Sequence, residues 1–122
     1  MLWRMSAEES NWYKVADSIE AIAFGVNNIA EVVVGGKHLC LATYKEKIFA
    51  FTRTCPHASG RLADGFIDAL GNVVCPLHRY KFCLKDGRNV SGEGYYLKHW
   101  LAEVRSDGVY VQLEKKVFFG LV

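Results

Sequence analysis

Turn signals recur at short intervals along this chain and separate runs rich in apolar, β-branched and aromatic residues. Gly35-Gly36, a two-residue hairpin signal, lies between the runs 31–34 and 38–44, and a third run follows at 48–52. These three runs predict an antiparallel meander. Because no window holds a sustained apolar period of 3.6 residues, little helix is expected beyond a possible turn at 18–23.

The second half of the chain continues in the same rhythm, with Gly- and Asp-containing turns between its apolar runs. About eight or nine short strands are expected in total, which suits an antiparallel sandwich or a small barrel. The sequence therefore predicts an all-β fold. The runs of the second half cover residues 65–68, 72–75, 81–84, 97–104 and 109–113.

Length and charge limit what such a fold can do. A chain of 122 residues buries roughly 65% of its unfolded surface, so it can fold alone around one core. We expect a single domain over residues 1–122, with its core at about 12–113. The net charge of +2 is spread without a basic run, so no nucleic-acid partner is expected. No stretch approaches the roughly 20 apolar residues of a membrane span.

The cysteines are better explained as reduced thiols or metal ligands than as disulfides. Residues 1–10 contain no apolar signal-peptide core and no cleavage site, which predicts a cytoplasmic location. Cys40 and Cys83 lie inside predicted strands, so we expect both to pack in the core. His38 and His99 flank apolar strands and are expected to be surface or structural histidines.

The other two cysteines, Cys55 and Cys75, each directly follow a predicted strand. Each is followed by a proline and then by a histidine, His57 after two residues and His78 after three. Proline fixes the backbone of these loops, and the remaining amides can point at sulfur. Two thiolates and two imidazoles predict a metal centre of either zinc or iron and sulfide.

With these residues the chain resembles the Rieske family, whose members carry Cys-x-His, a spacer of this order and Cys-x-x-His. The resemblance extends to Leu62 and Gly65 after the first half and to Phe82 and Gly87 after the second. It covers the strand pattern from about residue 12 to 113, and it implies the Rieske fold, with two cluster-binding loops at one tip of the domain.

The resemblance also implies a cofactor, one [2Fe-2S] cluster per chain. In the family two cysteines hold one iron and two histidines hold the other. By position this implies Cys55 with Cys75 and His57 with His78. The histidine-bound iron would then lie outermost, and a structural zinc site built from the same four residues is the alternative.

The chain departs from the family pattern at several positions, and the missing disulfide between the ligand loops points to the ferredoxin-type, low-potential branch. Gly60 and Leu77 stand where high-potential members carry a disulfide between the ligand loops. Arg79 replaces a usual glycine, and the segment 90–94 contains no proline where members usually have a proline-containing cover. Tyr80 and Phe82 stand where the other branch has a serine and a tyrosine whose hydroxyls raise the potential, so one hydroxyl is missing and the other is carried on a longer, differently directed ring.

The resemblance implies a soluble electron carrier and not an enzyme. Such a protein takes single electrons from a reductase to a terminal enzyme, such as a Rieske oxygenase, and the chain has no length left for a catalytic domain. The alternatives are the small Rieske-like subunit of a nitrite reductase and a zinc-stabilised interaction module. Docking of redox protein partners would use local positive charges near the ligand loops: Arg61, Arg79, Lys81 and Lys85.

Overall fold

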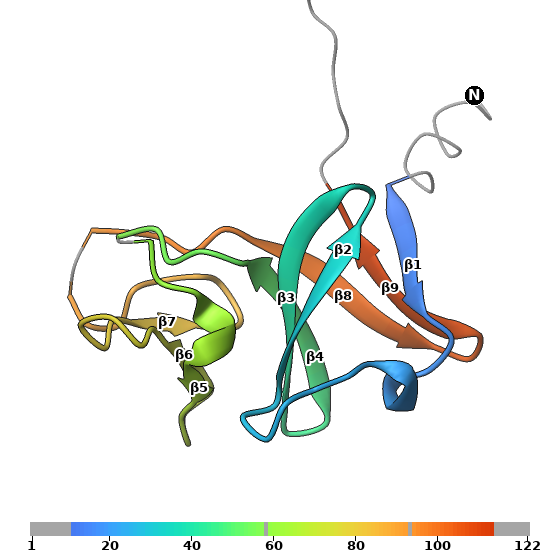
Figure 1. Cartoon of the computed structure of the whole chain (residues 1–122), viewed down its shortest axis with the longest axis horizontal. Coiled ribbons are helices and arrows are strands. Elements are labelled where there is room, and N and C mark those ends of the chain that lie inside the picture. Colours follow the sequence, from blue (N-terminus) through green and yellow to red (C-terminus); the bar gives the residue numbers. More distant parts are fainter. Residues whose placement is uncertain (1–10, 58, 93, 114–122) are drawn as a thin grey trace, which may run out of the picture.

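The computed structural model describes residues 11–57, 59–92 and 94–113 of the chain. These residues form two antiparallel sheets with two short 3-10 turns, η1 (Ile19–Ala21) and η2 (Leu62–Asp64) (Figure 1). The all-β prediction is confirmed. The strands are β1 (Trp12–Ala16), β2 (Ile29–Val34), β3 (Lys37–Tyr44), β4 (Lys47–Thr52), β5 (Phe66–Ile67), β6 (Asn72–Val74), β7 (Lys81–Cys83), β8 (His99–Arg105) and β9 (Gly108–Gln112).

The larger sheet has six strands in the order β1-β9-β8-β4-β3-β2 and curls into a half-barrel. Its predicted meander is confirmed, with Val34 paired to Lys37 across Gly35-Gly36. Both glycines have positive φ, as a two-residue turn matching the strand twist requires. Lys45 and Glu46 make the next turn with positive φ as well, so β4 begins at Lys47, one residue earlier than the apolar run.

The smaller sheet has the order β5-β6-β7 and lies at the end of the molecule away from β1 and β9 (Figure 1). Its first strand is shorter than the predicted run 65–68, for two local reasons. Gly65 closes η2 by donating its N–H to Leu62 O, and a Cβ on Gly65 would overlap the carbonyl oxygen of Val74. At the other end, the Asp68 carboxylate accepts the N–H of Leu70 and so starts the turn to β6.

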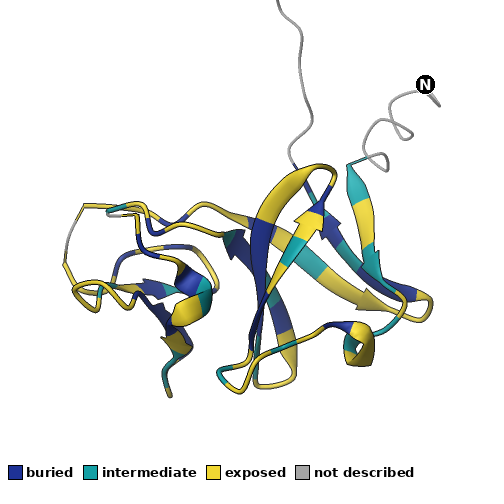
Figure 2. Ribbon diagram, in the orientation of Figure 1, coloured by how far each residue is buried: buried dark blue, intermediate teal, exposed yellow. Residues whose placement is uncertain are grey.

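Strands β3 and β4 are buried along most of their length because they serve two cores (Figure 2). Leu39 and Leu41 point into the half-barrel, whereas Cys40 and Ala42 point to the opposite face, under the smaller sheet. We call these the barrel core and the site core. The barrel core comprises Ile22, Ala30, Val34, Leu39, Leu41, Ile48, Ala50, Trp100, Val109, Val111 and Leu113. The site core comprises Ile29, Cys40, Ala42, Phe51, Cys55, Leu62, Val73, Cys75, Phe82, Leu84 and Leu97.

Most remaining expectations are confirmed. The turn at 18–23 is present as η1, whereas η2 was not predicted. Cys40 is fully buried and His38 and His99 are exposed, but Cys83 is only half-buried, so its assignment to the core is wrong. Cys83 ends the edge strand of the smaller sheet, where its thiol reaches Asp86 in the following turn. Among the described residues no helix has the length and apolar character to cross a membrane.

Candidate metal centre

The first ligand loop leaves β4 and folds back on itself before η2. Cys55 donates its N–H to Gly60 O at 2.9 Å, and a bridge between Thr54 and Arg61 closes the base of the loop. Leu62 then anchors the end of the loop in the site core, where it is fully buried. Backbone bonds therefore hold Cys55 and His57 on a short closed loop, as the position after a strand predicted.

The second ligand loop joins β6 to β7 and reverses within a few residues. Cys75 donates its N–H to Tyr80 O at 2.8 Å. His78 and Arg79 both take the left-handed conformation, with φ of 64° and 57°. This explains why the family usually has glycine at the second of these positions, since only glycine adopts this conformation without strain. Arg79 adopts this conformation at a cost in backbone strain, and its side chain is exposed to solvent.

The four predicted ligand residues meet between these loops. The donor atoms of Cys55, His57 and Cys75 all lie within 4.8 Å of one another. His57 Nδ1 is 3.2 Å from Cys55 Sγ, and His57 Nε2 is 2.9 Å from His78 Nδ1. Two segments separated by 17 residues (58–74) thus bring two sulfurs and two imidazoles to one place.

Burial divides the donors into two pairs. Cys55 and Cys75 are 3% and 0% exposed, whereas His57 is half-buried and His78 is exposed. Burial raises the pKa of Cys75; the N–H of Leu77, which hydrogen-bonds to its sulfur, opposes this rise, and the neighbouring Cys55 adds to it. The expected amide directed at sulfur is therefore present. A buried thiol loses its proton readily only when a bound cation stabilises the thiolate, so this pair suits a metal.

Packing beneath the sulfurs accounts for the other residues of the family pattern. Phe82 is fully buried in the site core, together with Cys55 and Cys75. Gly87 has a φ of +76°, and a Cβ there would overlap the carbonyl oxygen of Leu97. Phe82 therefore packs in the core that holds both sulfurs, and Gly87 permits the close approach of the Leu97 backbone. Neither residue supplies a ligand atom.

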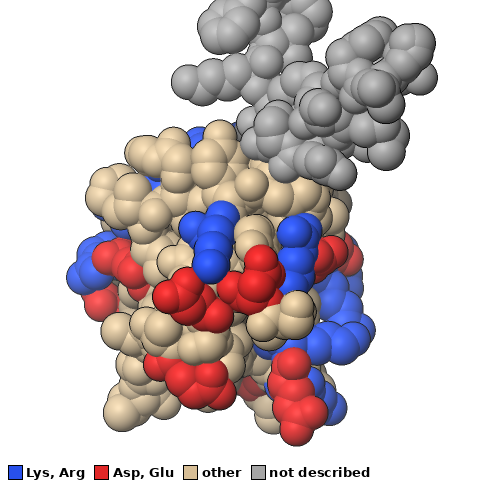
Figure 3. Space-filling model, turned by 90° about the vertical axis from the view of Figure 1, so that its right-hand side faces the viewer, with Lys and Arg blue, Asp and Glu red and all other residues tan. Residues whose placement is uncertain are grey.

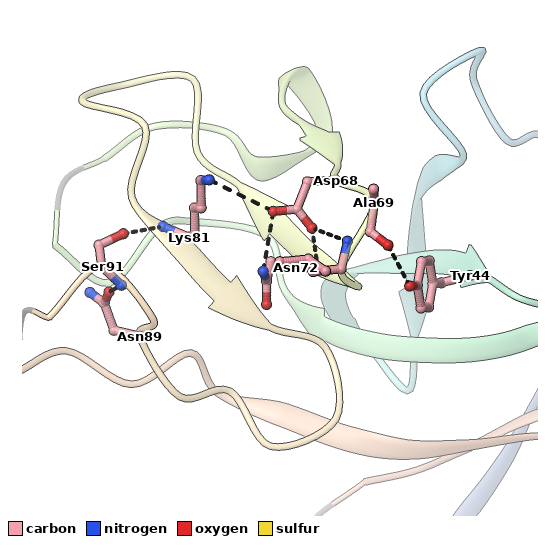
Figure 4. Close-up of polar contacts among 8 residues, drawn as sticks. Tyr44, Asp68, Ala69, Asn72, Lys81, Asn89 and Ser91 are labelled. Atoms are coloured by element: carbon pink, nitrogen blue, oxygen red, sulfur yellow. Dashed lines mark hydrogen bonds and ion pairs between the residues drawn. The ribbon is translucent and has the colours of Figure 1, made fainter.

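A polar network braces the smaller sheet beside the site (Figure 4). The Asp68 carboxylate accepts hydrogen bonds from the backbone N–H groups of Leu70 and Asn72 and from the Asn72 side chain, at 2.9–3.1 Å, and lies 3.9 Å from Lys81 Nζ. Burial raises the pKa of Asp68, but these hydrogen bonds and Lys81 outweigh it and hold the pKa below its ordinary value. From the end of β3, Tyr44 donates its hydroxyl to Ala69 O.

Aromatic residues around His57 are the part of the site that the motif did not reveal. The ring of Tyr80 stacks on the His57 imidazole, with centroids 3.5 Å apart and planes 15° apart. Tyr95 approaches from a third segment, at 5.7 Å from His57 and 6.1 Å from Tyr80. An aromatic residue two positions after the second histidine was the available signal for Tyr80, whereas Tyr95 carries none.

The cations expected near the loops differ in availability. Arg61 is paired with Glu31 at 2.8 Å and lies 3.5 Å from Asp64, and Lys81 faces Asp68. Arg79 and Lys85 are exposed and have no ion pair among the described residues. Cys40 lies below the site in the core, and burial raises its pKa to about 12, as a neutral packing residue requires.

Known proteins share both this sequence pattern and this fold. Residues 11–95 match the Rieske [2Fe-2S] domain family. The ferredoxin component of the naphthalene 1,2-dioxygenase system of Pseudomonas putida is 33% identical over 73 residues, which cover 57% of this chain and 69% of that relative. A chain in the solved complex of reduced oxygenase and oxidized ferredoxin in carbazole 1,9a-dioxygenase is 27% identical, with a TM-score of 0.71 and 88% and 98% of the two chains covered. The ferredoxin of carbazole 1,9a-dioxygenase from Nocardioides aromaticivorans IC177 has the same fold, with 18% identity, a TM-score of 0.72 and 85% and 99% coverage.

The chain belongs to the Rieske [2Fe-2S] domain family. Within that family it is a ferredoxin-type electron carrier rather than a catalyst, as its relatives are. The donor set fits the cofactor, since two buried thiols lie beside the His57 imidazole and His78 adjoins His57 on the solvent side. When bound, a [2Fe-2S] cluster takes up and releases one electron.

Proposed function

We propose that Cys55 and Cys75 hold one iron of the cluster and that His57 and His78 hold the other. The division of the donors supports this assignment, because both sulfurs are buried and both imidazoles lie on the solvent side. The zinc alternative predicts a colourless protein with one zinc per chain. Iron and acid-labile sulfide analysis of anaerobically purified protein tests the proposal, with two of each per chain expected.

We further propose that the protein delivers single electrons from a reductase to the terminal oxygenase of a dioxygenase system in the cytoplasm, as one domain over residues 1–122 with its core at 12–113. Its similarity to the naphthalene dioxygenase ferredoxin and to a chain of the carbazole dioxygenase complex supports this role. In this role the cluster end of the protein must meet each partner in turn.

The surface around the two imidazoles carries the docking part of this proposal. Leu77 and Tyr95 are 44% and 43% exposed, and they lie beside the site together with the cation of Arg79. Aromatic, aliphatic and arginine side chains of this kind are typical of the centre of a protein interface. At the opposite end of the molecule, acidic and basic side chains alternate across the visible face (Figure 3).

Electron transfer to a partner tests the role directly. Reduced holoprotein is mixed in a stopped-flow instrument with the oxidised oxygenase component from the same host, and the loss of one electron per chain is followed. Arg79→Glu should slow this step, whereas Lys14→Glu on β1, at the opposite end, should leave it unchanged at the same ionic strength. Equal rates for both variants would contradict docking at the cluster end.

A further inference from the structure

The imidazole of His57 is held on three sides. Its Nδ1 edge faces Cys55 Sγ at 3.2 Å and its Nε2 edge faces His78 Nδ1 at 2.9 Å. The ring of Tyr80 covers one face of the imidazole at 3.5 Å with a 15° tilt. The edge contacts place the two ring nitrogens beside the other donor atoms, and the stacked Tyr80 ring is the contact that sets the plane of the imidazole.

Tyr80 is in turn firmly anchored. Its carbonyl oxygen accepts the N–H of Cys75 at 2.8 Å, and its half-buried side chain packs against the site core. The Tyr80 ring therefore moves with the backbone of the second ligand loop while it contacts the histidine of the first. Through this pair of rings, the two loops are joined by side chains as well as by any metal they share.

The segment that carries Tyr95 is tied to the residue after Tyr80. Val90 donates its N–H to Lys81 O at 2.9 Å, and Lys81 donates its N–H to Ser91 Oγ at 3.0 Å. Ser91 in turn donates its N–H to Asn89 Oδ1, as Figure 4 shows. Tyr95 reaches the His57 and Tyr80 rings at 5.7 and 6.1 Å and so adds a third aromatic ring beside them.

We propose that Tyr80 is a positioning residue that sets the ring plane of His57 and, with Tyr95, limits water access to that imidazole. The inference rests on the proposed role of His57 as an iron ligand. Parallel stacking at this distance favours one orientation of the imidazole over rotation about its Cβ–Cγ bond. A ligand held in one plane presents the same orbital to iron in every molecule and releases iron more slowly.

The test uses holoprotein carrying Tyr80→Leu, Tyr80→Phe or Tyr96→Ala. Leucine keeps apolar bulk without a ring, phenylalanine keeps the ring without the hydroxyl, and Tyr96 is an exposed tyrosine beside Tyr95 with no ring contact to His57 among the described residues. We expect Tyr80→Leu to lose its cluster to an iron chelator roughly tenfold faster than wild type, the factor that about 1.4 kcal/mol represents. Tyr80→Phe and Tyr96→Ala should keep the wild-type rate.

A spectroscopic readout separates positioning from a general loss of stability. The electron paramagnetic resonance lines of reduced Tyr80→Leu should broaden, because the His57 plane varies between molecules, and Tyr80→Phe should restore the wild-type line width. Unchanged lines and rate in Tyr80→Leu would overturn the proposal. Failure of Tyr80→Phe to restore them would also overturn it, because the hydroxyl and not the ring would then act.

A further measurement covers the case in which Tyr80→Leu yields no holoprotein. Wild-type protein made with ring-deuterated tyrosine should show deuterium modulation in the electron spin echo of the reduced cluster, and Tyr80→Phe should weaken it. Equal modulation in the two proteins overturns the stack. The proposed ligand role fails separately, if His57→Ala retains two iron, two sulfide and the wild-type spectrum.

Discussion

The two ends of this molecule are stabilised in different ways. The half-barrel is a six-stranded sheet with continuous backbone pairing around an apolar core. The cluster end has three strands of two or three residues, and its loops rely on individual turn and side-chain hydrogen bonds. It also contains two consecutive left-handed residues, His78 and Arg79. We therefore expect the half-barrel to fold without a metal and the geometry of the cluster end to depend on a few contacts and on the cofactor.

The largest expected effect comes from removing one sulfur ligand, which should abolish the cluster and leave the half-barrel folded. Cys75→Ser should purify without iron or sulfide, because a hydroxyl is a poor substitute for a thiolate. Its far-ultraviolet circular dichroism should keep the β signal of the half-barrel. Metal analysis and dichroism of the same sample check both statements.

The matched control for that variant is Cys40→Ala, which removes a fully buried sulfur from the same core. Its visible spectrum should be that of wild type, since Cys40 supplies no ligand. Loss of the cluster in Cys40→Ala would show that packing beneath the loops, and not ligation, decides assembly.

Truncation within each core should come next in size. Leu41→Ala in the barrel core should lower the free energy of unfolding by about 2–5 kcal/mol, and Phe82→Ala in the site core by about 3–5 kcal/mol. Only Phe82→Ala should also accelerate cluster loss, because Phe82 lies in the same core as Cys55 and Cys75. Urea titrations followed by dichroism and by visible absorbance measure the two effects; equal cluster loss in both variants would mean that the ends are not separable.

A smaller effect is expected from the network of the smaller sheet. Asp68→Asn keeps one carbonyl acceptor for the two backbone N–H groups but loses the acceptor that faces Asn72 and Lys81, so stability should fall by about 1 kcal/mol at neutral pH. The folded-state pKa of Asp68 is lowered, so its contribution is present above the unfolded value of about 4 and is lost as pH falls through the folded value.

Thermal unfolding across this pH range checks the sign, because the difference between wild type and Asp68→Asn should shrink toward zero in acid. The exposed Asp64 provides a control, because Asp64→Asn removes only a surface pair with Arg61 and should change the unfolding temperature little. A constant difference between wild type and Asp68→Asn down to acid pH would contradict the assigned hydrogen bonds.

The smallest effect concerns the strained turn of the second loop. Arg79→Gly should raise the free energy of unfolding by up to about 1 kcal/mol, because glycine adopts the left-handed conformation without strain and its flexibility in the unfolded chain offsets part of the gain. Arg88→Gly, at an exposed arginine without positive φ, should be destabilising instead. Chemical denaturation of the two holoproteins shows whether the signs differ.

Local chemistry accounts for what could be predicted from the sequence alone. The Gly35-Gly36 turn sets the first hairpin because both residues need positive φ, and that requirement is met within the turn itself. The run of apolar residues in 38–44 likewise indicates a strand. The donor set around Cys55 and Cys75 can be predicted because the identity and spacing of the ligand residues are properties of the sequence itself. The assignment of each pair of ligands to one iron stays a prediction.

Tertiary structure decided the features that depend on residues far apart in the sequence. Successive side chains of a strand point to opposite faces, so Leu41 and Cys40 can be placed on different faces of β3 from the sequence. The sequence does not show that both faces are buried, because the smaller sheet must cover one of them. Cys83 was misplaced because its burial depends on its position at the edge of that sheet. The stack of Tyr80 on His57 arises only when two loops meet, because the side chains that a residue contacts are set by packing and not by its neighbours along the chain.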